Sequence, residues 1–109
     1  MDNIKSNGYY IDKILSDINF IIAHVAEISR EQFSSDEVLQ DSMMFRLIQI
    51  SENAKKVSAE FKALHSDIPW VDVYGLRNRI VHEYGNVDMS IVYDTLVNDI
   101  PDFLRKLNS

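Results

Sequence analysis

The sequence predicts an all-α fold, a small antiparallel bundle of four to five helices that forms one domain over residues 1–109. Apolar residues recur at three- and four-residue steps along most of the chain, the period of helices that bury one face. Strand-like alternation and a glycine-rich phosphate loop are both missing from the sequence. A chain of 109 residues is long enough for one hydrophobic core and too short for two.

The first two predicted helices each carry a long apolar stripe. A second helix is expected to begin after Ser34, because Ser34 and Glu37 have the spacing of a capping box. Phe33 and Val38 occupy the positions of a hydrophobic staple at the same point. The stripe of the first helix is Ile11, Ile14, Leu15, Ile18, Ile21, Ile22, Val25 and Ile28. That of the second is Met43, Leu47, Ile50, Ala54, Val57, Phe61 and Leu64.

Proline and glycine set the limits of the third predicted helix. Pro69 is tolerated in a first helical turn, so this helix should start near Trp70. Gly75 costs about 1 kcal/mol relative to alanine inside a helix and predicts a bend there. Gly85 and Asn86 then supply a C-terminal stop.

The last predicted helix begins at a polar cap. Asp88 can accept hydrogen bonds from the first free backbone N–H groups. Pro101 falls inside this helix and should bend it or end it early. The apolar stripe comprises Val92, Leu96, Ile100, Phe103 and Leu107.

The charge balance limits the partners that the protein can have. With a formal net charge of -6, a general nucleic-acid-binding surface is disfavoured, because phosphate contacts need clustered Lys and Arg. No DNA partner is expected, and any RNA site must be local. The nearest approach to a basic cluster combines Arg77 and Arg79 with Lys55 and Lys56. The acidic stretches at residues 36–41 and 94–102 are interpreted as solvated helix faces.

Several classes of protein are excluded by what the sequence lacks. It has no cysteine, hence no disulfide framework and no thiolate metal site. His24, His65 and His82 are too scattered for a zinc spacing. We therefore expect no metal and no cofactor. No apolar run approaches the ~20 residues of a membrane span, and the N-terminus has no apolar signal core. A cytoplasmic protein with no membrane partner is expected.

Residues 76–84 place an arginine, an asparagine, a histidine and a tyrosine on one short helix. Histidine can take and give a proton near neutral pH, and the forked charge of arginine suits a phosphate. Together they suggest phosphodiester chemistry without a metal.

The helical period separates these side chains around the helix axis. At about 100° per residue, Asn78 and His82 lie together, nearly opposite the predicted core stripe of Leu76, Ile80 and Tyr84. His82 should therefore be exposed within one protomer. Arg77 lies about 140° around the helix from His82, so one helix does not bring the two together. Two antiparallel copies of the helix in a homodimer would bring them together.

The order of these residues is specific. Arg77 and Asn78 are followed after three residues by His82, and after one more residue by Tyr84. This pattern resembles the signature of the HEPN superfamily, and closely that of its HepT branch. Ser51 and Asn53 stand where that family commonly has Gly and Ala. Flanking segments resemble the family over essentially the full chain: residues 50–56, 68–70, 87–88, 93–94 and 99–101.

The resemblance implies a HEPN-like helical bundle that forms a homodimer with the motif at its interface. It implies a metal-independent endoribonuclease with an RNA substrate, acting as the toxin of a toxin–antitoxin pair. The implied partner is an MntA-like minimal nucleotidyltransferase antitoxin, which transfers AMP from ATP to the tyrosine of the His-x-Tyr element, here Tyr84. The alternative is a non-catalytic subunit that presents a nucleotide or Tyr84 to the nucleotidyltransferase. A third possibility is an inert helical dimer.

The matched residues then have predicted catalytic roles. His82 would take the proton of a ribose 2′-hydroxyl or protonate the departing 5′-oxygen. Arg77 would hold the scissile phosphate, and Asn78 would orient the imidazole or bind phosphate. Arg79, Lys55 and Lys56 are candidate RNA contacts.

Each of these side chains also has a structural interpretation. His82 could be an ordinary exposed histidine, and Arg77 could form a salt bridge with Asp72 or Glu52. Tyr84 could be a half-buried tyrosine. Trp70 and Tyr74 are interpreted as packing residues rather than a base-stacking platform, and His24 and His65 as structural or solvated.

Overall fold

The computed structural model describes residues 6–83 and 85–108, and every regular element in these ranges is helical. The all-α prediction is therefore confirmed. No helix in these ranges is both long and apolar enough to cross a membrane. The elements are α1 (Asn7–Val25), α2 (Arg30–Ser34), α3 (Glu37–Lys55), α4 (Ala59–Leu64), α5 (Trp70–Glu83), α6 (Met89–Asp94), the π-helix η1 (Thr95–Asp99) and α7 (Ile100–Leu107).

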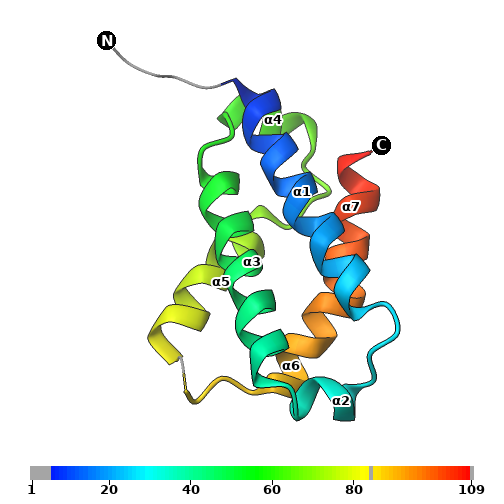
Figure 1. The fold of residues 1–109 in the computed structure, drawn as a ribbon. Helices are drawn as coiled ribbons and strands as arrows, with labels where there is room; N and C mark the ends of the chain where they lie inside the picture. The colour runs from blue at the N-terminus through cyan, green and yellow to red at the C-terminus, as the bar shows by residue number, and fades with distance from the viewer. Residues whose placement is uncertain (1–5, 84, 109) are drawn as a thin grey trace.

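Helix α3 lies at the centre of the bundle. It packs against α1 on one side and α5 on the other, as Figure 1 shows. Both η1 and α7 pack against α1, whereas α6 packs against α2. The short helices α2 and α4 lie at opposite ends of α3 in the same view (Figure 1). The motif helix α5 therefore rests on α3.

Helix α1 buries the predicted stripe. Ser6 caps the helix by accepting a hydrogen bond from the Tyr9 N–H (3.3 Å). The buried members of the stripe are Ile14, Ile18, Ile21 and Val25. The helix ends at Val25, three residues before the last predicted member of the stripe, Ile28.

The predicted capping box at Ser34 and Glu37 is wrong. Ser34 is the last residue of α2, and α3 is capped by Asp36, whose carboxylate accepts from the Leu39 N–H (3.0 Å). Val38 is 81% exposed and forms no staple. The capping box lies one helix earlier: the Ser29 hydroxyl accepts from the Gln32 N–H, and the Gln32 side chain accepts from the Ser29 N–H. Glutamine at the third helical position serves as well as glutamate does.

The second helix does not continue to Leu64 as predicted. It ends at Lys55, and Ser58 starts the separate helix α4. The Ser58 N–H donates to the Asn7 side chain (2.9 Å), which itself donates to the Ser58 hydroxyl (3.0 Å). This pair takes the N–H that a continuous helix would need for its own ladder. It also ties the start of α1 to the start of α4.

Helix α5 begins at Trp70, as predicted. The indole is buried among Phe61 and Phe103 and donates its N–H to the His65 carbonyl (3.1 Å), which confirms the packing role of Trp70. The helix runs unbroken through Gly75, where a Cβ would meet no atom within 4 Å. Gly85 has a φ of +96° beyond the helix end, a conformation that favours glycine and supplies the predicted stop.

The last helical run starts at the predicted cap and then departs from α-geometry. The Asp88 carboxylate accepts from the Ser90 N–H (2.9 Å). Pro101 does not end the helical run, which continues to Leu107. The turn before it is irregular: residues 95–99 form a π-helix, and the Ile100 N–H donates to the Thr95 carbonyl. Proline has no N–H to donate, and a local π-turn is a common accommodation within an α-helix.

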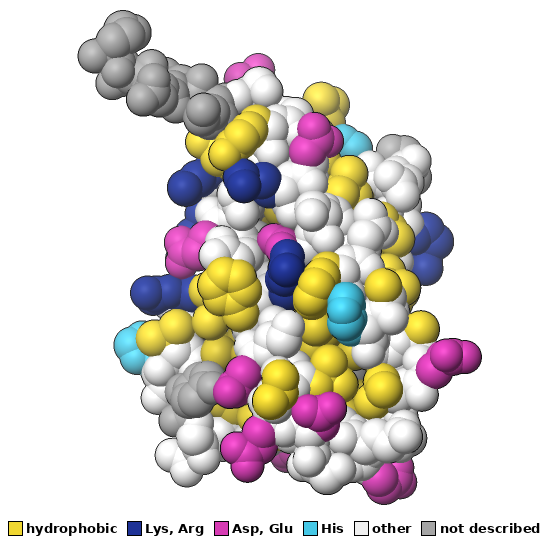
Figure 2. Space-filling model, in the orientation of Figure 1, with side chains coloured by type: hydrophobic (Ala, Val, Ile, Leu, Met, Phe, Trp, Pro, Cys, Tyr) yellow, Lys and Arg dark blue, Asp and Glu magenta, His cyan; other side chains and the backbone are white. Residues whose placement is uncertain are grey.

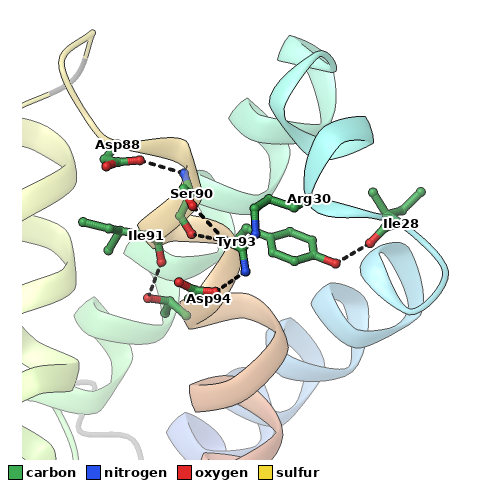
Figure 3. Close-up of polar contacts among 8 residues, drawn as sticks. Ile28, Arg30, Asp88, Ser90, Ile91, Tyr93 and Asp94 are labelled. Carbon is green, nitrogen blue, oxygen red and sulfur yellow. Dashed lines mark hydrogen bonds and ion pairs between the residues drawn. The ribbon is translucent and has the colours of Figure 1, made fainter.

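An arginine from α2 fastens α6 to the rest of the bundle (Figure 3). Arg30 donates to the Ser90 carbonyl (3.0 Å) and hydroxyl (2.8 Å) and to the Asp94 carboxylate (2.7 Å). The hydrogen bond to Asp94 raises the pKa of Arg30 above its ordinary value. The guanidinium lies over the Tyr93 ring, whose hydroxyl donates to the Ile28 carbonyl (2.5 Å). These contacts hold α6, the first helix after α5, against α2.

Candidate active site

The contact between α3 and α5 positions the motif. Ser51 is completely buried, and its hydroxyl donates to the Tyr74 carbonyl in α5 (3.0 Å). Asn53 is also buried and donates to the Gln49 carbonyl one turn earlier (2.9 Å). Of the two residues that depart from the family pattern, Ser51 thus bonds across to α5 and Asn53 bonds within α3. Ile80 is buried beneath the motif, as its place on the core stripe predicted.

Arg77 is held by an acid from the neighbouring helix. Its Nε atom lies 3.2 Å from the Glu52 Oε1 atom, and the two side chains are 40% and 42% exposed. The ion pair with Glu52, one of the two that the sequence suggested, is confirmed. The Arg77 Nη1 atom also lies 3.4 Å from the Asn78 side-chain oxygen, a long hydrogen bond. The guanidinium is therefore turned towards α3.

His82 and Asn78 are exposed, which confirms the predicted orientation of this helix face. Among the described residues, none forms a hydrogen bond or an ion pair with the imidazole. Tyr84, the predicted modification site, lies outside the described residues. Within the described part of one protomer, the Arg77 guanidinium bonds to Asn78 and Glu52 and forms no hydrogen bond with the His82 imidazole.

Arg79 faces a different environment from Arg77. It lines a cleft of about 350 Å³ together with Asp72, Asp99 and Asp102. Partial burial, with Asp102 and Asp72 nearby, raises the pKa of Asp99, and Arg79 opposes that rise. Arg79 therefore offsets negative charge in an acidic cleft. It also borders a smaller, more apolar cleft beside residues 86–88.

The two predicted lysines lie at the end of α3, where both are exposed. Lys56 lines a groove of about 420 Å³ between α1 and α3, and Lys13 and Arg46 line the same groove. The structure groups Lys56 with these two cations and not with Arg79. Lys13 and Arg46 were missed because only the pairing of α1 with α3 brings residues so far apart in the sequence to one groove.

The other two histidines have packing roles. His24 stacks on Phe20, and its Nδ1 atom lies 2.8 Å from the Phe20 carbonyl oxygen. His65 stacks on Phe61. Both therefore match the structural interpretation. In residues 6–83 and 85–108, no three His, Cys, Asp or Glu side chains are grouped so that they could hold a metal ion.

Comparisons with known proteins agree on one family. The model of the "Ribonuclease HepT-like" family matches residues 14–109. A protein of Caldanaerobacter subterraneus subsp. tengcongensis named "Putative RNase TTE0752" is 34% identical over 95% of this chain and 93% of its own. "Probable ribonuclease HepT" of Thermococcus cleftensis is 31% identical over 94% and 93%. No solved structure matches the chain. The family model that matches residues 14–109, together with relatives that are 34% and 31% identical over 95% and 94% of the chain, places the chain in the HepT-like ribonuclease family.

Proposed function

We propose that the protein is a metal-independent endoribonuclease of the HEPN type, the toxin of a toxin–antitoxin pair. The observation that carries the proposal is the exposure of His82 and Asn78 on α5, beside an arginine that is only half-buried, in a chain of the HepT-like family. An exposed imidazole is accessible to a large substrate such as RNA.

The reaction requires one base and one acid. His82 of one copy accepts the proton of a ribose 2′-hydroxyl, and the 2′-oxygen attacks the adjacent phosphorus. The bond from phosphorus to the 5′-oxygen breaks, and His82 of the second copy, in its protonated form, donates a proton to that oxygen. The products are a 2′,3′-cyclic phosphate and a 5′-hydroxyl. No metal takes part in these steps.

Arg77 stabilises the negative charge that develops on the phosphate. Its present partner is Glu52, and both side chains are about two-fifths exposed. Exposed ion pairs contribute only about 0–1 kcal/mol, so a substrate phosphate can compete with Glu52 for the guanidinium. Asn78, beside Arg77 and on the same face as His82, orients the imidazole or binds a phosphate oxygen.

A homodimer around α5 would complete the site. Arg77 pairs with Glu52 on α3 while His82 is exposed, and no hydrogen bond joins the two side chains in the described part of one protomer. A two-fold axis beside α5 would place both histidines and both arginines along one groove. The dimer therefore supplies the acid and the base from two identical residues.

Regulation is proposed to act at Tyr84. An MntA-like minimal nucleotidyltransferase would catalyse attack of the Tyr84 hydroxyl on the α-phosphorus of ATP, with pyrophosphate as the leaving group. The attached AMP adds a negative charge and a bulky adenosine two residues from His82. The charge competes with RNA for Arg77, and the adenosine obstructs the groove.

Cleavage of RNA by site variants tests the proposal. His82→Ala and Arg77→Ala should each abolish cleavage and growth inhibition, with the helical circular dichroism spectrum retained, because both side chains are off the core stripe. His24→Ala, which alters another exposed histidine, is the matched control and should cleave normally. EDTA should have no effect. Cleavage that needs magnesium or survives His82→Ala would contradict the mechanism, and a native protein that accepts AMP without cleaving RNA would favour the non-catalytic subunit.

A further inference from the structure

The groove between α1 and α3 concentrates positive charge on an acidic protein. Lys13, Arg46 and Lys56 all line it, although the chain as a whole has a net charge of -6. Figure 2 shows Lys and Arg side chains over the upper and middle parts of the face formed by α1, α3 and α5, whereas Asp and Glu predominate at the lower end. The positive charge of this face is therefore local.

Two of these cations carry charge that the protein itself does not neutralise. Arg46 forms an ion pair with the nearly buried Asp17 (2.8 Å) and covers the Phe20 ring. Lys13 and Lys56 form no ion pair within the described residues. Their ammonium groups lie 5.4 and 5.8 Å from the centres of two tyrosine rings. The groove therefore offers two ammonium groups, which aromatic rings hold in place.

Aromatic and amide groups lie between the cations. Phe45 lines the groove, and 54% of its surface is exposed. Large apolar side chains are more often buried, and this exposed ring is accessible to a ligand. Gln49, one turn further along α3, lines the same groove. A positively charged groove with an accessible ring is the combination that binds single-stranded nucleic acid, because the cations contact phosphates and the ring stacks on a base.

The groove is adjacent to the candidate active site. Gln49 and Lys56 lie three and four residues from Glu52 on α3, and Glu52 holds Arg77. Residues at these separations are neighbours on a helix surface. A strand whose scissile phosphate is bound by Arg77 would therefore reach Lys56 within about one helical turn.

We propose that the groove between α1 and α3 binds the single-stranded RNA that flanks the scissile phosphate. Lys13 and Lys56 bind backbone phosphates, and Phe45 stacks on a base. The inference rests on the proposed ribonuclease function and deepens it by stating how the substrate is held. A groove of about 420 Å³ has the size of a small-ligand cleft and suits a single strand, whereas RNA duplexes are recognised across wide, shallow minor grooves.

RNA binding at several salt concentrations tests the proposal. A labelled single-stranded oligoribonucleotide is titrated with the His82→Ala protein, in which cleavage is not expected, and its fluorescence anisotropy gives Kd. When Lys13→Gln and Lys56→Gln are both introduced into the His82→Ala protein, the slope of log Kd against log salt should fall by about 1.4, or ~0.7 for each lost phosphate contact. Adding Phe45→Ala should weaken binding by roughly 5- to 150-fold, the effect of losing one stacked base.

Matched controls lie on other surfaces. Lys106→Gln removes a lysine of α7 that pairs with Asp102, and Leu64→Ala truncates an exposed apolar side chain of α4. Both should leave Kd and the salt slope unchanged. Arg46 is not a suitable test position, because its loss would leave the Asp17 carboxylate nearly buried without its partner.

The outcomes separate the groove from the chemistry. If native protein cleaves RNA but the two lysine substitutions change neither Kd nor the salt slope, the groove proposal is overturned and the ribonuclease remains. If native protein neither binds nor cleaves RNA, both proposals fail. If the groove variants become monomeric in light scattering while native protein is dimeric, the groove is a contact between two copies and the RNA assignment is overturned.

Discussion

Glu52 on α3 and Arg77 on α5 form an ion pair across the helix contact, with 3.2 Å between the carboxylate Oε1 and the guanidinium Nε. Glu52 thus determines the position of the Arg77 guanidinium, the proposed phosphate-binding group, before RNA binds. The pair is partly exposed, so the arginine can exchange partners at little cost.

Glu52→Gln should tighten RNA binding while leaving the fold intact. The substitution removes a carboxylate that competes with phosphate for Arg77, an interaction of about 1 kcal/mol between exposed charges, which corresponds to up to about fivefold in Kd. Anisotropy titrations in the His82→Ala protein measure the effect. Glu60→Gln, which alters an exposed acid on α4, is the control. Weaker binding in Glu52→Gln would mean that Glu52 holds Arg77 in its productive orientation.

Val81→Glu should convert a dimer into monomers. Val81 is 44% exposed on α5, next to His82, so a homodimer formed around the motif would bury it and would have to desolvate the new charge. Light scattering at micromolar concentration gives the mass, and RNA cleavage should fall with the dimer. Val71→Glu places the same charge at the other end of α5, at a position that is 80% exposed, and should remain dimeric. A native protein that is monomeric at this concentration would remove the composite site.

Tyr84→Phe should escape silencing by the nucleotidyltransferase. Without the hydroxyl there is no acceptor for AMP, so the variant should keep cleaving RNA after incubation with the partner enzyme and ATP. Peptide mass mapping of the native protein should locate the added AMP on Tyr84. Tyr10→Phe is the control and should be silenced like the native protein. AMP found on another residue, or a silenced Tyr84→Phe, would disprove the switch.

Asp99→Asn should raise the melting temperature at pH 7. Partial burial and neighbouring carboxylates raise the pKa of Asp99, so the folded state binds its proton more tightly than the unfolded chain does. The stability that this group contributes is therefore present below its ordinary pKa of 3.8 and is lost as pH rises through the raised value.

The asparagine variant avoids that loss, and its advantage should disappear as the pH falls towards 3.8. Because Asp99 is exposed, the gain at pH 7 should be no more than about 3 °C. Thermal unfolding followed by circular dichroism between pH 4 and pH 8 measures it. Asp12→Asn, at an exposed position of α1, is the control. A lower melting temperature at pH 7 would show that attraction to Arg79 outweighs the cost of burial.

Several helix starts and stops that depend on one or two neighbouring residues were predicted correctly from the sequence. Trp70 after a proline, Asp88 as a cap and Gly85 as a stop are found where the sequence placed them. The capping box failed because two serines compete within six residues, and Ser29 has the glutamine that completes the motif. The break at Ser58 depends on Asn7, 51 residues away, and nothing near Ser58 indicates that partner.

In the candidate site too, some features were predicted from the sequence and others were not. The helical period alone predicted that His82 and Asn78 are exposed, and the sequence offered Glu52 as one of two partners for Arg77. It did not group Lys13 with Lys56, because their proximity arises from the pairing of α1 with α3. Local sequence therefore predicts the orientation of each side chain on its helix, but not which side chains from different helices meet.

The contacts of Arg30 also have a consequence for the order in which the chain folds. Its hydrogen bond to Asp94 joins residues that are 64 positions apart, and α3 and α5 lie between them. Closing so long a loop costs chain entropy that is offset only after the intervening helices have packed. The contacts of α2 with α6 should therefore form late, and amide protons of α6 should exchange with solvent earlier than those in the centre of α3.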